Sequence, residues 1–397
     1  MKVVIFSQSP ISTSPRVVKE ANCLARNGYN VQIFALWYDA EIIKNERWLL
    51  DPRIIYKAGI DITTKNIQSI FYRIKRRLYR ELTRILGTQS KHALGYGYGQ
   101  YLKKLKAEKA DLYIGHEEMS LALAKDLIDE GFKVAFDFED FHSHDLLTKD
   151  QLYRPIKLLS FLESFVLNNA VYCITTSDSL AIELAREYHT NLPITVYNSF
   201  HSYPSIEKRI FPRNSNSLVW ISQVIGPGRG LELLIEGIST SKLTYELTLI
   251  GKKDFEFCNL ILKSSPKNLK VIFSDYLPPK QISIELQKFD VGIAFEEKYP
   301  KSRDLTITNK IFHYLNSGLA ILATNTTGQL EIQKKTKEAI KLVSFNPKEI
   351  CQCLEEIFAK KEIIEVMKSQ SRFFGKEVFC FEKEEEKILK LVWDVLA

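Results

Sequence analysis

The chain has 397 residues. Single hydrophobic cores stop growing at about 250–300 residues, so two domains are expected. Hydrophobic residues make up 45% of the chain and charged residues 26%, which is typical of globular proteins and excludes fibrous or disordered classes. The formal net charge of +7 does not by itself indicate a nucleic-acid-binding protein. It suits a polyphosphate ligand or an anionic membrane surface equally well.

The start of the chain gives no sign of a signal peptide, because Met1 and Lys2 lead directly into an apolar run that predicts a strand over 3–6. No apolar run approaches the roughly 20 residues that span a bilayer. The six cysteines show neither a CxxC pair nor the spacing of a zinc site, so we expect reduced thiols. We therefore expect a cytoplasmic protein whose only membrane contact would be peripheral.

The first elements predict the start of a nucleotide-type α/β domain. The strand over 3–6 ends in a polar loop, and an amphipathic helix follows that stops at Asn27-Gly28 before a strand over 31–35. The loop between the first strand and this helix lacks the GxGxxG pattern, so the sequence does not predict a dinucleotide-binding site there.

The segment 67–86, IQSIFYRIKRRLYRELTRIL, predicts a basic amphipathic helix. Two interpretations stay open. The apolar stripe packs into the domain core and leaves a charged outer face, or the helix lies in an anionic membrane interface. The stripe consists of Ile67, Phe71, Ile74, Leu78, Leu82 and Ile85, with Arg73, Arg76, Arg77, Arg80 and Arg84 opposite.

Two strands of the first half end in polar tips. The strand over 110–114 leads to His116 and Glu117, and the strand over 134–138 leads to a loop, 139–145, that contains Asp140 and His142. Carboxylates and histidines of this loop are potential metal ligands, although no DxD triplet appears. A solvated loop is the alternative interpretation.

The second half begins after a segment rich in Ser, Pro, Asn and Arg over 201–217, which predicts a linker. A strand over 218–221 then leads to the glycine-rich turn 226–230, which opens a helix. Gly228 and Gly230 let the backbone approach a phosphate, and Arg229 at the helix start can contact two of its oxygens. Further alternation of strands and helices predicts a second doubly wound sheet.

The segment 306–331, TITNKIFHYLNSGLAILATNTTGQLE, reads as helix, glycine stop, buried strand and new helix start. Its two polar breaks are candidate ligand loops, because anions bind at the amino ends of helices and the carboxyl ends of strands. Lys310 adds a positive charge to the first break.

This segment, with its pattern NKIFxYLxxGLAIxAT…GQxE, resembles the donor-binding half of GT-B-fold retaining glycosyltransferases of the family 4-like kind (glycosyl transferases group 1). The resemblance returns more loosely along most of the chain. It implies an α/β protein of GT-B architecture, with two Rossmann-like doubly wound domains facing a cleft. The expected parts are an acceptor-side domain over 1–200, a linker over 201–217, a nucleotide-sugar-binding domain over 218–372 and a helix crossing back over 373–397.

The resemblance also implies roles for single residues. His116 corresponds to a histidine beside the transferred sugar, with Glu117 and Asp140 as further catalytic candidates, and Arg16 and His142 as acceptor-side candidates. The enzyme is expected to need no metal and no cofactor, since the nucleotide-sugar is a substrate. The donor-binding candidates are Gly228, Arg229, Gly230, Glu297, Thr308, Asn309, Lys310, Gln329 and Glu331.

One departure concerns the E-x7-E signature of that family. Counting back from Gly318 places His313 and Leu305 at the two glutamate positions, and Asp304 is one residue out of register. The resemblance therefore predicts a hexosyltransferase-like enzyme that moves sugar from a nucleotide-diphosphate-sugar to a glycan or lipid-linked acceptor in bacterial cell-surface polysaccharide synthesis. A peripheral position on the inner face of the cytoplasmic membrane would involve 67–86, and no nucleic acid is expected. A GT-B sugar-nucleotide epimerase and a non-catalytic nucleotide- or partner-binding relative are the alternatives.

Overall fold

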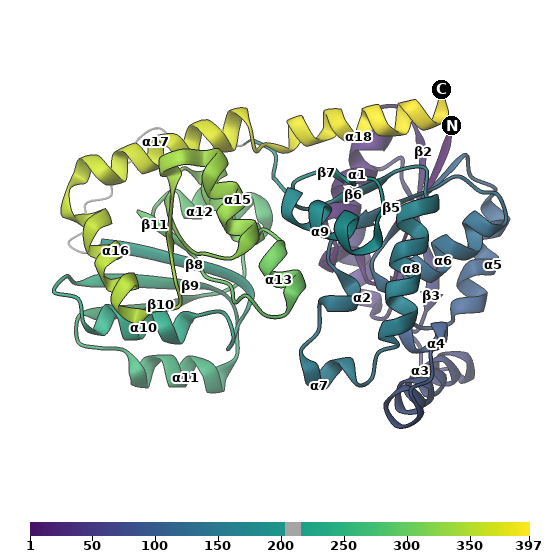
Figure 1. Ribbon diagram of the computed structural model, residues 1–397, viewed down its shortest axis with the longest axis horizontal. Coiled ribbons are helices and arrows are strands. Elements are labelled where there is room, and N and C mark those ends of the chain that lie inside the picture. Colours follow the sequence, from purple (N-terminus) through teal and green to yellow (C-terminus); the bar gives the residue numbers. More distant parts are fainter. Residues whose placement is uncertain (203–215) are drawn as a thin grey trace. The chain divides into compact units, whose positions relative to one another are not determined.

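The computed structural model describes residues 1–202 and 216–397, so most of the predicted linker over 201–217 lies outside the described residues. The chain divides into two compact units, each built on one parallel sheet (Figure 1). Unit 1 consists of Met1–Val196, Pro300–Ser302 and Glu385–Ala397, and unit 2 consists of Tyr197–Tyr299 and Arg303–Glu384.

The described part of unit 1 contains the strands β1 (Lys2–Ser7), β2 (Asn30–Trp37), β3 (Ile55–Asp61), β4 (Leu112–His116), β5 (Val134–Phe138), β6 (Cys173–Thr175) and β7 (Ile194–Thr195). Their order in the sheet is β3-β2-β1-β4-β5-β6-β7, and all neighbours are parallel. The order changes direction between β1 and β4. At such a topological switch point two loops diverge, which opens the crevice where doubly wound sheets bind ligands.

Helices of unit 1 connect these strands, as parallel pairing requires. The short β7 ends the sheet before the chain enters unit 2, and α18 returns to unit 1 from Glu385 onward. The helices are α1 (Pro15–Arg26), α2 (Ala40–Glu46), α3 (Ile67–Leu86), α4 (Lys91–Leu94), α5 (Tyr98–Glu108), α6 (Glu118–Asp129), α7 (Thr148–Gln151), α8 (Ile156–Asn169), α9 (Asp178–Tyr188) and α18 (Phe381–Leu396).

The described part of unit 2 contains the strands β8 (Asn216–Ile225), β9 (Tyr245–Lys253), β10 (Leu269–Ser274), β11 (Val291–Ala294), β12 (Ala320–Thr324) and β13 (Ile340–Val343). Their parallel order, β10-β9-β8-β11-β12-β13, places the switch point between β8 and β11. The helices are α10 (Leu231–Ser239), α11 (Phe255–Ser264), α12 (Pro279–Leu286), α13 (Lys301–Leu305), α14 (Asn309–Ser317), α15 (Thr327–Thr336), α16 (Pro347–Ala359) and α17 (Lys361–Glu377).

The sheet of unit 2 is buried on both faces. Successive residues of a strand point to opposite faces, so Leu218 and Trp220 belong to one hydrophobic cluster while Val219 and Ile221 belong to another. Continuous apolar strands such as β12, Ala320–Thr324, are therefore required, and these are the runs that the sequence shows most clearly. The expected α/β class with two doubly wound sheets is confirmed.

Helix α3 forms over the predicted range, Ile67–Leu86, but its apolar stripe is not part of a core. Ile67, Phe71, Ile74, Leu78 and Ile85 are all exposed in unit 1. The interpretation in which this stripe packs into the domain is therefore wrong, because the opposite, polar face of the helix contacts the unit instead. No helix among the described residues is long and apolar enough to cross a membrane.

Candidate active site

The switch point of unit 1 brings the carboxyl ends of β1 and β4 side by side. Ser7 is the last residue of β1 and pairs in register with His116, the last residue of β4. The chain turns sharply after His116, because Glu117 has φ 70° and ψ 173° before α6 begins. Nearly all residues in this backbone region are glycines, and a side chain here costs about 1–3 kcal/mol.

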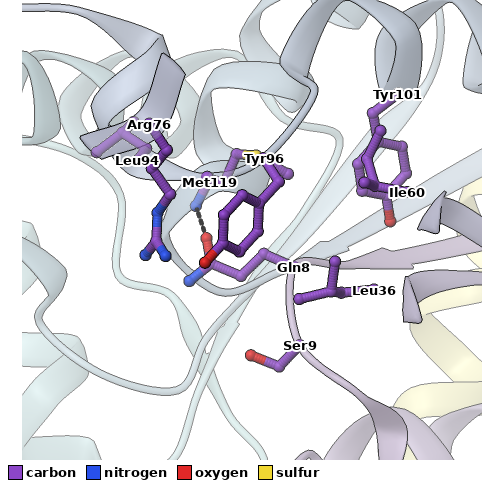
Figure 2. Close-up of a pocket in the computed structure, with 10 residues that line it drawn as sticks. Gln8, Ser9, Leu36, Ile60, Arg76, Leu94, Tyr96, Tyr101 and Met119 are labelled. Carbon is purple, nitrogen blue, oxygen red and sulfur yellow. Dashed lines mark hydrogen bonds between the residues drawn. The ribbon is translucent and has the colours of Figure 1, made fainter. Parts of the chain in front are cut away.

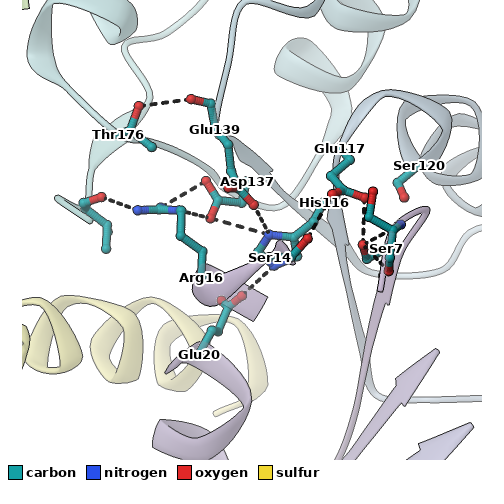
Figure 3. A network of polar contacts seen from close by, with 12 residues as sticks. Ser7, Ser14, Arg16, Glu20, His116, Glu117, Ser120, Asp137, Glu139 and Thr176 are labelled. Carbon is teal, nitrogen blue, oxygen red and sulfur yellow. Dashed lines mark hydrogen bonds and ion pairs between the residues drawn. The ribbon is translucent and has the colours of Figure 1, made fainter. Parts of the chain in front are cut away.

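His116 lies at the centre of a buried ionic network (Figure 3). Its Nε2 lies 2.8 Å from Glu20 Oε2 and its Nδ1 lies 3.2 Å from Glu139 Oε1. Burial lowers the pKa of His116, but the hydrogen bonds to Glu139 and Glu20 outweigh burial and raise it to about 10. The ring is therefore an imidazolium at neutral pH, and both of its N–H groups donate.

A second cation, Arg16, completes this network. Its Nε donates to Asp137 Oδ2 at 2.6 Å, its Nη2 donates to Asp137 Oδ1 at 3.0 Å, and its Nη1 donates to the Val196 carbonyl at 2.7 Å. Arg16 and Asp137 are almost completely buried, whereas the Glu139 side chain is 21% exposed. Glu139 is thus the carboxylate of this network that is most accessible from outside unit 1.

The side chain of Glu117 is held by two hydroxyl groups. Ser7 Oγ donates to its Oε2 at 2.7 Å, and Ser14 Oγ donates to its Oε1 at 2.9 Å (Figure 3). Burial, and then the charge of Glu139, raise the pKa of Glu117 although these hydroxyls oppose the shift. Glu117 thus has a strained backbone, an oriented carboxyl group and a raised pKa, which are features of an acid–base residue.

The two candidates of the following loop lie farther along the chain within unit 1. Asp140 Oδ1 accepts from Ser302 Oγ at 3.3 Å. His142 begins a short 3-10 turn, His142–His144, and burial lowers its pKa to about 4, so it is neutral at pH 7. A neutral imidazole can act as a base or as a hydrogen-bond partner of a hydroxyl group.

Donor atoms of His116, Asp137 and Glu139 lie within 4.8 Å of one another, which is close enough to surround a metal ion. The chemistry of these groups does not favour that use. A protonated imidazole has no lone pair for a metal, and Arg16 already binds both oxygens of Asp137. The arrangement fits an internal ion-pair network better than a ligand set.

The network of unit 1 has more carboxylates than cations, whereas the switch point of unit 2 has an excess of positive charge. The turn after β8 has positive φ at Gly228 and Gly230, and Gly230 is the N-cap of α10. Between them, Arg229 Nη1 lies 3.0 Å from both carboxylate oxygens of Glu296, which follows β11. The Arg229 side chain is 41% exposed, so it is accessible to a ligand.

Lys310 approaches the same carboxylate from α14. Its Nζ donates to Glu296 Oε1 at 2.6 Å, and Thr308, the N-cap of α14, donates its hydroxyl to that oxygen at 3.1 Å. Burial raises the pKa of Glu296, but Lys310 and Arg229 outweigh burial and lower it to about 2. Burial lowers the pKa of Lys310, which Glu296 partly offsets. One carboxylate therefore faces two cations.

The other donor candidates have different partners within unit 2. Asn309 Oδ1 accepts from Asn198 Nδ2 at 2.8 Å, Glu331 accepts from the Tyr197 hydroxyl at 2.9 Å, and Gln329 is fully buried. Glu297 is 44% exposed and lies 3.9 Å from Arg303. The network is thus built on Glu296, one residue before the predicted Glu297.

The sequence does not single out several members of both networks, namely Ser7, Ser14, Glu20, Asp137 and Glu296, and it indicates Glu139 only as a potential metal ligand. One signal was present. Asp137 interrupts the apolar strand β5 between Phe136 and Phe138, and a carboxylate in a buried strand needs a cationic partner. The sequence alone does not say that this partner is Arg16, which is 121 residues away.

No protein-family model and no curated protein matches the chain. Solved structures do match over nearly its whole length. A sucrose-phosphate synthase from Thermosynechococcus elongatus is 14% identical, with TM-score 0.74 and coverage of 100% of this chain and 99% of that one. The chain has the GT-B fold.

Two further structures with this fold are similar. The Anabaena protein HepE in complex with UDP is 12% identical, with TM-score 0.70 and coverage of 99% of this chain and 100% of HepE. TarM of S. aureus, solved as a mutant with Fondaparinux, alpha-GlcNAc-glycerol and UDP, is 9% identical, with TM-score 0.67 and full coverage of both chains. At these identities the comparison shows the fold alone.

Proposed function

We propose that the chain is a glycosyltransferase that moves a sugar from a nucleotide-diphosphate-sugar to a glycan or lipid-linked acceptor. The observation that carries this proposal is the cationic network at the switch point of unit 2, where Arg229 and Lys310 share Glu296. In a doubly wound sheet the switch point is where a nucleotide binds, and two cations fit a diphosphate. Solved proteins with the same fold contain UDP.

The chemistry of transfer suits this arrangement. When the bond between the sugar and the diphosphate breaks, negative charge develops on the leaving phosphate oxygens. Arg229 is exposed enough to exchange Glu296 for a phosphate, while buried Lys310 stays fixed and maintains a positive potential. The amino ends of α10 and α14 add partial positive charge at the same place.

Unit 1 supplies the acid–base groups of the proposal. Glu117 is the candidate that activates or orients an acceptor hydroxyl, because its carboxyl group is held by Ser7 and Ser14 and its pKa is raised by burial. His116 is a positioning residue, since both ring nitrogens contact carboxylates. Retention of the anomeric configuration and participation in cell-surface polysaccharide synthesis rest on the sequence resemblance. We propose that no metal takes part.

Donor binding tests the proposal directly. UDP-, GDP-, ADP-, CMP- and dTDP-sugars are titrated into the protein by calorimetry, with EDTA or with magnesium. We expect one nucleotide class to bind equally under both conditions, and Arg229→Gln to weaken it about 10- to 100-fold, because a charge-assisted hydrogen bond contributes roughly 1.5–3 kcal/mol. Lys270→Gln removes a 70% exposed cation of the same unit and should leave the affinity unchanged.

Binding of no nucleotide-sugar, or equal binding by wild type and Arg229→Gln, would refute the donor site. Turnover then separates the candidate activities. Conversion of the bound nucleotide-sugar without an acceptor would favour an epimerase. Binding without transfer to any acceptor would favour a non-catalytic relative. His313 supports that alternative, because it stands where the resembling family has a glutamate. Its ring stacks on Phe200 with the ring centroids 3.8 Å apart.

A further inference from the structure

Helix α3 presents its apolar side to the outside of unit 1. Ile67 is 89% exposed, Ile74 is 61% exposed and Phe71 is 56% exposed, and Leu78 and Ile85 continue this apolar ridge. Helices of a globular unit normally turn such a stripe toward the core, so the orientation of α3 is reversed. Figure 1 shows α3 at the outer edge of unit 1, beside α4. An apolar ridge of this length needs a partner.

The polar side of α3 is fixed against the unit, so the helix cannot simply rotate its ridge inward. The Arg76 guanidinium lies over the Tyr96 ring at 4.5 Å, and Arg80 Nε donates to the Ala93 carbonyl at 3.2 Å. Both ends of the helix are capped, by the Asn66 side chain at the first turn and by left-handed Gly87 at the last. The exposed ridge is therefore a stable feature of unit 1.

An arginine groove runs beside this helix. It has a volume of about 490 Å³ and is lined by Arg73, Arg76, Arg77, Arg80 and Arg154, with Glu81 and Asp150 as its acids. Glu81 pairs with Arg84, and Arg154 pairs with Glu118. Arg76 Nε and Arg80 Nη2 are buried without a hydrogen-bond partner among the described residues. Burial and the neighbouring Arg76 and Arg154 lower the pKa of Arg80 to about 10. Such a groove is electrostatically complementary to phosphate groups.

The combination of an apolar ridge and a phosphate-complementary groove on one helix restricts the kind of partner that α3 can bind. A soluble anion needs only the groove. Helix α3 has six cations and one acid, so the α3 helices of two copies would repel each other. A phospholipid surface satisfies both features, because acyl chains contact the ridge and anionic headgroups contact the exposed side chains of Arg73 and Arg77. We propose that α3 is a membrane-binding helix that lies in the interface of an anionic phospholipid bilayer.

The groove adjoins the candidate site of unit 1. A cavity of about 150 Å³ shares Arg76 and Tyr96 with the groove and extends to Gln8 and Ser9 in the loop after β1 (Figure 2). Gln8 Oε1 accepts from the Met119 backbone N–H at 2.6 Å, so this loop is tied to α6. Binding of α3 to a bilayer would hold this loop, which follows Ser7, near the headgroups. A lipid-linked acceptor for unit 1 is a consequence that rests on the proposed function, whereas membrane binding does not.

Flotation of the full chain with vesicles tests membrane binding without any sugar nucleotide. We compare vesicles of phosphatidylcholine with vesicles of equal parts phosphatidylcholine and phosphatidylglycerol. We expect binding to the anionic vesicles that weakens at least tenfold in Phe71→Ser/Ile74→Ser and in Arg73→Gln/Arg77→Gln, and that falls with rising salt. The controls are Phe255→Ser, which removes a 77% exposed ring in unit 2, and Arg53→Gln/Arg186→Gln, which removes two exposed cations of unit 1.

Several outcomes would overturn the membrane proposal. One is equal binding to both kinds of vesicle, and another is unchanged binding by the ridge variant. If millimolar pyrophosphate displaces the wild-type protein from vesicles while Phe71→Ser/Ile74→Ser still binds them, the groove binds phosphate and the ridge takes no part. A dimer that light scattering detects in wild type and not in Phe71→Ser/Ile74→Ser would assign the ridge to a second copy. Because no donor is present, failure here is distinguishable from failure of the proposed function.

Discussion

The two units place a buried ionic network at the same topological position and give it opposite charge. At the switch point of unit 1, the carboxylates of Glu20, Asp137 and Glu139 surround two cations. At the switch point of unit 2, Arg229 and Lys310 surround one carboxylate. Topology thus determines where a site forms, whereas the few residues that follow the strands decide which charge the site offers to a ligand.

The largest expected effect comes from removing a carboxylate of unit 1. Asp137→Asn leaves the buried Arg16 guanidinium without its ion-pair partner, and breaking a buried pair costs about 3–5 kcal/mol of unfolding free energy. The measurement is urea unfolding followed by circular dichroism. Glu130→Gln is the matched control, because its partner Lys106 and Glu130 itself are both partly exposed and such pairs contribute about 0–1 kcal/mol. Equal losses in both variants would show that the network of unit 1 contributes no more than a surface pair.

The corresponding change in unit 2 is expected to be smaller. Glu296→Gln leaves Lys310 buried, but burial already lowers the pKa of Lys310, so this lysine can lose its proton instead of staying charged. We expect a loss of about 2–3 kcal/mol, most of which Lys310→Met should restore in the double variant. Unfolding of unit 2 is followed by fluorescence of Trp220, its only tryptophan and 0% exposed, in a background in which Trp37, Trp48 and Trp393 of unit 1 are replaced by phenylalanine. A double variant less stable than Glu296→Gln would contradict this reasoning.

The dependence of stability on pH should differ between the units. The pKa of His116 is raised to about 10, so its contribution is complete below about pH 6.5 and is lost as pH rises toward 10. The free energy of unfolding of unit 1 should fall by roughly 1 kcal/mol per pH unit as the pH rises above about 6.5. The pKa of Glu296 is lowered to about 2, so unit 2 keeps its contribution above about pH 4.5 and loses it as pH falls toward 2.

Thermal melts between pH 3 and pH 10 measure this difference in the same background without Trp37, Trp48 and Trp393, so that Trp220 fluorescence reports unit 2 while circular dichroism reports both units. His116→Gln is the comparison variant for the alkaline side, since an amide cannot titrate. Its melting temperature should start lower than that of wild type and then depend less on pH above neutrality. An unchanged alkaline slope in this variant would assign the dependence to another group.

The sequence predicts the central elements well and the long-range pairings poorly. α3, Ile67–Leu86, has the predicted bounds, and the central strands are found because burial on both faces requires continuous apolar runs. The edge strands β3 and β13 are missed, because each is only partly buried and a lysine, Lys57 or Lys341, interrupts its apolar residues. Residues that follow strands are easy to find, but the pairing of Arg16 with Asp137 depends on the order of strands in the sheet. The same limit applies to α3, whose helical pattern is clear while its orientation depends on Tyr96 and Ala93.

The smallest expected effect concerns the turn beside each network. Unit 2 has glycines at the positive-φ positions of its turn, Gly228 and Gly230, whereas unit 1 has Glu117 at φ 70°. Replacing Glu117 by alanine removes the carboxyl group and keeps the backbone strain, and replacing it by glycine removes both. We therefore expect Glu117→Gly to be about 1 kcal/mol more stable than Glu117→Ala in urea unfolding.

This comparison separates the carboxyl group of Glu117 from its backbone. If Glu117 acts on an acceptor, both variants should lose transfer activity to a similar extent, although Glu117→Gly regains stability. Glu117→Gln keeps the strain and the size of the side chain, and it should lose the activity that depends on protonation. Equal stability of the glycine and alanine variants would mean that the turn relaxes without cost. The strained glutamate would then be no evidence for a functional role, and unit 1 would be left with His116 and its carboxylates as a purely structural counterpart of the cationic site in unit 2.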